Sequence, residues 1–145
     1  MLPYQVEQYA FRLLEEQGLD DWGFEFLEAR RTAGLCIYKR KVIAVSRPFI
    51  RLNSDLEIID TVKHEVAHAL VGSQAHHGPI WRLKCIELGG NPEATCTDGL
   101  FPMGKYVAVC RVCGKRHHKY RKPKGLRFCK KCYHLGFREP LEYKI

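Results

Sequence analysis

The stretch that most restricts the fold of this chain is Lys63–Trp81, KHEVAHALVGSQAHHGPIW, which holds four of the seven histidines. Two of them, His64 and His68, flank Glu65 at the spacing H-E-x-x-H. Residues four apart in an α-helix lie on one face, so a helix would let both imidazoles reach the same ion. Two such ligands with a carboxylate base beside them are what a zinc hydrolase needs to activate water.

Signals on both sides of the motif predict that it lies within a helix. Ser54 and Glu57 form a capping-box pattern at its start, and Gly72 can end it. The apolar residues around the motif favour a true metal site over a chance occurrence of a motif that has only three fixed residues. Apolar residues recur at helical spacing: Leu56, Ile59, Val62, Val66 and Leu70.

A zinc hydrolase needs a third protein ligand, and the residues alone leave its identity open. The metzincin pattern fails, because Val71 and Gln74 occupy the positions at which it requires glycine and histidine. A carboxylate from the next helix, Glu87, is one candidate. The adjacent histidines of the following loop, His76 and His77, are the imidazole candidates.

Patterns elsewhere in the first hundred residues predict an α+β fold. Helices are predicted over residues 2–17 and from Pro79 to Gly89 or Gly90. A strand is predicted around Phe24 and Phe26, and two short strands joined by a basic turn over residues 34–46. RPFIRLN, residues 47–53, is predicted as a further extended segment. Together these elements predict helices packed on a small antiparallel sheet.

At this point the sequence resembles a known family. HEVAH, eight further residues and then HGPIW are similar to the SprT-like metalloprotease domain, which includes Spartan, and residues 30–53 resemble the β segment before its active helix. The resemblance implies a zincin-like domain with zinc ligands His64, His68 and His77 and Glu65 as the general base. His76 stays open between a solvated loop residue and a group that stabilises the oxyanion or orients substrate.

Four of the seven cysteines form two matched pairs. Cys110-x2-Cys113 and Cys129-x2-Cys132 are separated by 15 residues, a spacing typical of zinc sites. Four thiolates give closed tetrahedral coordination, so a structural zinc is predicted in a small β-rich ribbon. A segment this polar is expected to need the metal to fold. Cys36 and Cys85 are interpreted as small buried apolar residues. Neither they nor Cys96 have a partner at the spacing of metal ligands.

The distribution of charge divides the chain near residue 100, before the cysteine pairs. Residues 1–100 carry 11 Lys and Arg against 14 Asp and Glu, whereas residues 101–145 carry 13 against 2. We therefore predict a peptidase domain over 1–100, a linker within 91–105, and a basic ribbon over 101–145. Seven basic residues lie between the cysteine pairs: Lys115, Arg116, Lys119, Arg121, Lys122, Lys124 and Arg127.

This basic segment predicts nucleic acid as a partner. Lys and Arg can contact phosphates, and the interleaved Tyr120 and Phe128 can stack on exposed bases. Single-stranded DNA or distorted duplex is the favoured ligand, and the alternatives are a solubilising charged face or a surface for RNA or an acidic protein. Seven cysteines without an apolar leader favour metal binding over disulfides, and no apolar run could span a bilayer. We expect a protein that is not secreted, is cytoplasmic or nuclear, has no membrane partner and is a monomer.

The favoured hypothesis is a zinc metalloendopeptidase with one catalytic and one structural zinc. The family resemblance implies substrates that are proteins bound or crosslinked to DNA, which connects the protein with DNA repair. The alternative is a non-catalytic zinc- and nucleic-acid-binding protein, associated with transcription or repair, in which both metals are structural.

Overall fold

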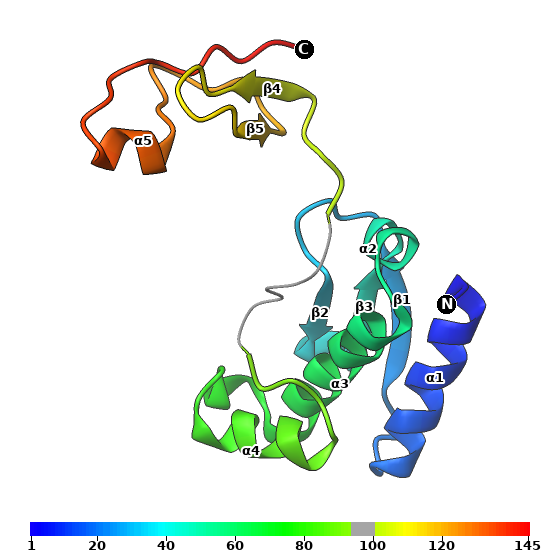
Figure 1. Ribbon diagram of the computed structural model, residues 1–145. Helices are drawn as coiled ribbons and strands as arrows, with labels where there is room; N and C mark the ends of the chain where they lie inside the picture. Colours follow the sequence, from blue (N-terminus) through cyan, green and yellow to red (C-terminus); the bar gives the residue numbers. More distant parts are fainter. Residues whose placement is uncertain (94–100) are drawn as a thin grey trace. The chain divides into compact units, whose positions relative to one another are not determined.

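A computed structural model describes residues 1–93 and 101–145 of the chain. The chain forms two compact units, Met1–Pro102 and Met103–Ile145 (Figure 1). Cys96 and part of the predicted linker lie outside the described residues. Among the residues that are described, no helix has both the length and the apolar character needed to cross a bilayer.

The first unit contains a three-stranded sheet of β1 (Gly23–Leu27), β2 (Gly34–Ile37) and β3 (Val42–Ser46), in the order β1-β3-β2. β3 runs antiparallel to β2 but parallel to β1, so the prediction of an antiparallel sheet was wrong for one of the two pairings. The short turn between β2 and β3 forces those strands to be antiparallel. The alternation that marks β1 as a strand carries no information about the direction of its partner.

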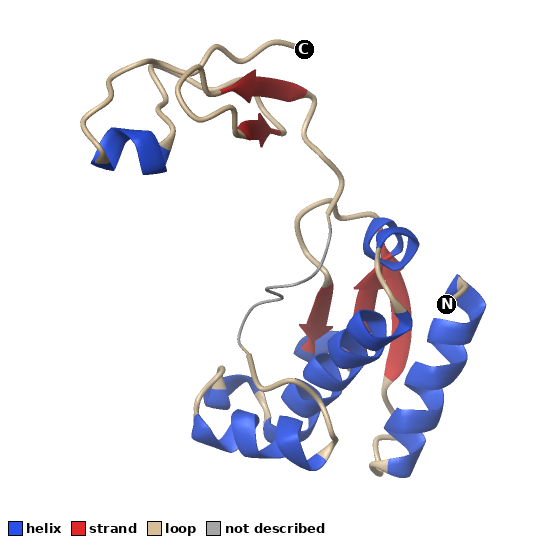
Figure 2. Ribbon diagram, viewed as in Figure 1, coloured by secondary structure: helices blue, strands red, loops and turns tan. Residues whose placement is uncertain are grey.

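Helices complete the unit (Figure 2). They are α1 (Pro3–Glu16), α2 (Arg47–Leu52), α3 (Asp55–Val71) and α4 (Pro79–Glu87), with short 3-10 turns η1 (Tyr38–Arg40) and η2 (Ser73–Ala75). The prediction that residues 47–53 are extended was wrong. The Ser46 hydroxyl accepts a hydrogen bond from the Phe49 amide at 3.3 Å, and Pro48 is compatible with a first helical turn, so α2 forms.

The predicted helix around the histidine motif is confirmed. The Ser54 hydroxyl accepts from the Glu57 amide at 3.4 Å, and Gly72 follows the last turn with φ 86°. α3 packs against β2 and β3 on one side and against α1 and α4 on others. Leu56 departs from the predicted apolar series and is 68% exposed. The core buries side chains from α1, β3, α2 and α3: Val6, Ala10, Leu13, Leu14, Ile43, Val45, Phe49, Ile50, Ile58, Val62 and Val66.

The second unit is built from β4 (Tyr106–Val109), β5 (Arg116–Lys119) and α5 (Lys130–His134). β4 and β5 form an antiparallel hairpin. Gly104 lies against β5 so closely that a Cβ there would be 2.3 Å from the Lys119 carbonyl carbon. Its amide donates to Nδ1 of His118 at 2.8 Å. The unit has almost no apolar core apart from its cysteines, which lie next to the hairpin and α5.

Candidate metal centre and active site

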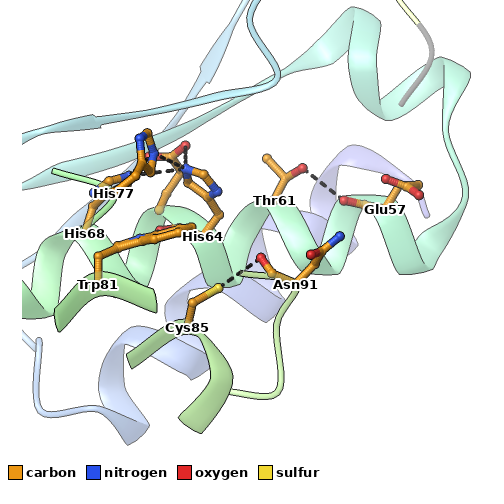
Figure 3. A network of polar contacts seen from close by, with 9 residues as sticks. Glu57, Thr61, His64, His68, His77, Trp81, Cys85 and Asn91 are labelled. Carbon is orange, nitrogen blue, oxygen red and sulfur yellow. Dashed lines mark hydrogen bonds and ion pairs between the residues drawn. The ribbon is translucent and has the colours of Figure 1, made fainter. Parts of the chain in front are cut away.

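α3 and the chain that follows it bring three imidazoles together. His64 and His68 lie one turn apart on α3, and the return of the chain places His77 opposite them (Figure 3). The Nε2 atoms are 3.1 Å apart for His64 and His77, 3.2 Å for His68 and His64, and 3.0 Å for His68 and His77. The alternative ligand Glu87 has a side chain 64% exposed and is paired with Lys84 at 2.7 Å.

The three imidazoles fit a zinc ion. With Zn–N bonds of about 2.0–2.1 Å, tetrahedral ligand nitrogens lie about 3.3–3.4 Å apart, close to the spacing here. Burial, followed by the neighbouring imidazoles, lowers the pKa of His64 to about 3. The same causes lower the pKa of His68 to about 4. Both rings are therefore neutral at physiological pH, the form that binds metal.

Glu65 lies beside this cluster and not within it. Its side chain is buried, and its Oε1 is 4.0 Å from Nε2 of His64. Burial raises the pKa of Glu65 to about 8, so in the absence of a nearby cation the carboxyl holds a proton at neutral pH. A cation at the three imidazoles would favour the ionised form and lower this pKa. The position suits a group that accepts and returns a proton.

Gly34 of β2 is a site residue that the sequence analysis did not identify. A Cβ at this position would lie 3.0 Å from Cγ of Glu65 and 2.9 Å from Cγ2 of Thr61. Glycine thus allows the edge strand to pass directly over the side chain of the glutamate. An isolated glycine in a strand pattern can signal such a close approach, and this was the available clue.

His76 occupies an unusual backbone conformation. With φ 49° and ψ −138°, it is the first central residue of a turn in which the Gly78 amide donates to the Ala75 carbonyl at 3.0 Å. A type II′ turn has this geometry, and glycine is the residue that adopts it without strain. The turn directs His77 towards the two helix histidines. His76 therefore contributes through its backbone, whatever its imidazole does.

Replacing His76 with glycine is expected to stabilise the protein by about 1 kcal/mol. Relief of a strained conformation that costs about 1–3 kcal/mol outweighs the extra chain entropy of glycine. Thermal unfolding measures the gain, and His76→Ala, which keeps the strain, should show little. A loss of stability in His76→Gly would contradict this account of the turn. Comparing cleavage by wild type with cleavage by the two variants, both of which lack the imidazole, then separates a solvated imidazole from one that assists the reaction.

The four paired cysteines form a second cluster. Their sulfur atoms lie within 4.8 Å of one another, with Sγ separations of 3.7 Å for Cys110 and Cys132 and 3.8 Å for Cys113 and Cys129. A tetrahedral zinc with Zn–S bonds of about 2.3 Å separates its sulfurs by about 3.8 Å. The Cys113 amide is the main cause that lowers the pKa of Cys110 to about 7, which favours the thiolate. The cluster therefore fits a closed zinc site.

The remaining described cysteines have a structural setting. Cys85 is completely buried between α4 and α3, and Cys36 is half-buried against the core. Burial, with a smaller effect of the Glu65 carboxylate, raises the pKa of Cys36 to about 12, so this thiol is unreactive at neutral pH.

The basic residues between the cysteine pairs are all exposed. They lie on or next to β5 and in the loop before α5, and none of the seven pairs with an acidic side chain within the described part of the chain. The aromatic residues between them, Tyr120 and Phe128, are half-buried. Phe128 contacts Tyr133, with ring centroids 5.2 Å apart. The positive charge of this loop is thus available to a polyanion.

Comparison with known families identifies the family of the chain. The model of the SprT-like family matches residues 5–98, and the chain belongs to that family. This family is generally related to metalloproteases. The matched range contains all three histidines and Glu65 and ends before the cysteine pairs. No curated protein matches the sequence.

Proposed function

We propose that this protein is a zinc-dependent metalloendopeptidase that acts on proteins bound or crosslinked to DNA. The observation that carries the proposal is the convergence of three imidazoles beside a buried carboxyl, in a chain of the SprT-like family. Three protein ligands leave one zinc position open, which is typical of catalytic sites, whereas four thiolates close the second site. A purely structural role for both metals does not account for that difference.

His64, His68 and His77 would hold the catalytic zinc, which supplies Lewis-acid chemistry towards water and a peptide carbonyl. Glu65 takes a proton from the attacking water and then gives it to the leaving amine. Its buried position keeps the proton beside the reacting atoms, and the adjacent edge strand β2 holds the side chain in place. The proposed roles therefore assign one base and three ligands to residues of one helix and one turn.

The proposed association with DNA is supported by the exposed positive charge of the second unit. Seven exposed basic side chains, none in an ion pair within the described residues, lie on or next to β5 and in the loop that follows it, near aromatic rings that can stack on bases. This arrangement favours single-stranded or distorted DNA, because stacking requires unpaired bases. The substrate class itself comes from the resemblance to the SprT-like domain.

Cleavage of a basic protein bound to single-stranded DNA tests the proposed function. We expect cleavage by the purified chain, its loss after a zinc chelator, and its return when zinc is added. Omitting the DNA should reduce the rate, because enzyme and substrate would no longer be held on the same strand. Absence of cleavage under all conditions by a chain that contains zinc would support the non-catalytic alternative.

Replacing Lys119, Arg121 and Lys122 together with alanine is expected to weaken DNA binding. Each lost phosphate contact reduces the slope of log K against log salt by about 0.7 for a single strand. Titration of labelled single-stranded DNA at several salt concentrations measures both the affinity and the slope.

A control for the loss of charge is available in the first unit. Each of three basic residues there is paired with a carboxylate: Arg40, Lys41 and Arg47. Their joint replacement removes the same number of positive charges from residues outside the proposed DNA surface. It should leave the salt slope unchanged, and equal effects of the two triple variants would contradict a localised DNA surface.

A further inference from the structure

The indole of Trp81 lies against all three imidazoles of the metal centre. Its ring is stacked on His68 with an interplanar angle of 22° and a centroid distance of 5.2 Å. It meets His64 edge-on at 4.6 Å and His77 edge-on at 4.7 Å (Figure 3). Trp81 has no exposed surface. One flat side chain therefore contacts every ligand of the proposed site.

Trp81 is also fixed to the helix that carries two of those ligands. Its Nε1–H donates to the backbone carbonyl of His64 at 3.3 Å. The remainder of the ring packs with Ala67 and Cys85, which are completely buried. The indole can thus neither rotate nor slide without losing a hydrogen bond and part of this small apolar cluster.

His68 lacks the partner that usually orients a ligating histidine. Such a histidine normally donates its second ring N–H to a carboxylate, a carbonyl or water. Here Nδ1 of His68 is buried and has no hydrogen-bond partner among the described residues. Nε2 of His68 is directed at the other two histidines, and among the described residues the stacked ring contact of His68 is made by the face of Trp81.

We propose that Trp81 is a positioning residue that holds the three imidazoles in their metal-binding orientation by ring packing. This inference rests on the proposed function, because it assumes that the triad holds zinc. Stacking takes over for His68 the task that a hydrogen bond at Nδ1 performs elsewhere. The two edge-on contacts limit rotation of the other rings. A ligand set that is already ordered loses little entropy when the ion binds.

Zinc affinity of the triad, measured on the full chain by competition with a chelator, tests this role. Trp81→Leu keeps an apolar side chain but removes the flat ring, and we expect it to weaken binding by about 10- to 100-fold, as loss of an orienting partner does. Trp81→Phe keeps a smaller ring and loses the Nε1–H, so its affinity should lie between those of Trp81→Leu and wild type. If Trp81→Leu does not fold, an unchanged affinity in Trp81→Phe overturns the proposal.

Cys85→Ala is the matched control. It removes volume from the same apolar cluster, and Cys85 makes no ring contact with the histidines. We expect it to lower thermal stability and to leave zinc affinity unchanged. Equal losses of affinity in Cys85→Ala and Trp81→Leu would show that Trp81 acts only as a core residue.

A second readout shows whether the triad, and not only the cysteine cluster, binds a metal ion in the chain that keeps Trp81. In a Trp22→Phe background Trp81 is the only tryptophan, so binding of Co2+ at the adjacent imidazoles should quench its fluorescence. If the wild-type triad binds no zinc, the proposed function fails before any variant is compared. If it binds zinc, and Trp81→Leu binds it equally tightly, only the positioning role fails.

Discussion

Replacing Cys129 with serine is expected to unfold residues 103–145 and to leave residues 1–102 folded. The buried apolar side chains of the second unit are Ala108 and three cysteines. The metal site therefore takes the place of a hydrophobic core in this unit. Structural zinc contributes on the order of 10–16 kcal/mol to the folding of small zinc domains. Hydrogen exchange read separately for peptides of the two units should show protection lost in the second unit alone.

Zinc analysis of the same variant completes the test, because the cysteine site should be empty while the histidine site keeps its ion. Cys36→Ser provides a control, since this half-buried thiol belongs to neither cluster and should leave zinc content unchanged. Protection of the second unit that survives in Cys129→Ser without bound zinc would contradict the view that the metal replaces a core.

Glu65→Gln is expected to lower the rate of cleavage by about 10²- to 10⁴-fold, the usual contribution of a general base. The amide has nearly the shape of the carboxyl and no charge, so the buried position should accept it without loss of folding stability. Zinc content should stay at the wild-type value, because Glu65 lies beside the ligands and is not one of them. Single-turnover cleavage together with metal analysis measures both results.

Glu87→Gln is the control for this substitution. Glu87 is exposed, pairs with Lys84, and was the carboxylate alternative for the third ligand. It should cleave substrate at the wild-type rate and keep both zinc ions. Loss of zinc in Glu87→Gln, or full activity in Glu65→Gln, would overturn the assignment of roles at the site.

Features that depend on local signals were predictable from the sequence. The helical spacing and the cap at Ser54 each involve residues within one or two helical turns. They were therefore sufficient to predict α3 and the position of its two histidines. The spacing of the cysteine pairs likewise indicated a cluster, because two cysteines with two residues between them can bind one ion. His77 was assigned by resemblance, and the observed nitrogen distances agree with it.

Features that depend on packing between distant segments were not predictable. The parallel pairing of β1 with β3 depends on a crossover, and periodicity does not record it. The helix at Arg47–Leu52 follows from a cap by the buried Ser46, in a stretch whose residues also suit a strand. The close approach of Gly34 to Glu65 and the stack of Trp81 on His68 join residues 31 and 13 positions apart.

The proposed function requires that three histidines hold a zinc ion separate from the one at the cysteines. The most direct test is the zinc content of purified wild type and His77→Ala, measured by elemental analysis on the full chain. We predict two zinc ions per chain in wild type and one in His77→Ala, with cleavage lost in the variant. One zinc per chain in wild type, unchanged in His64→Ala and His77→Ala, would contradict the claim.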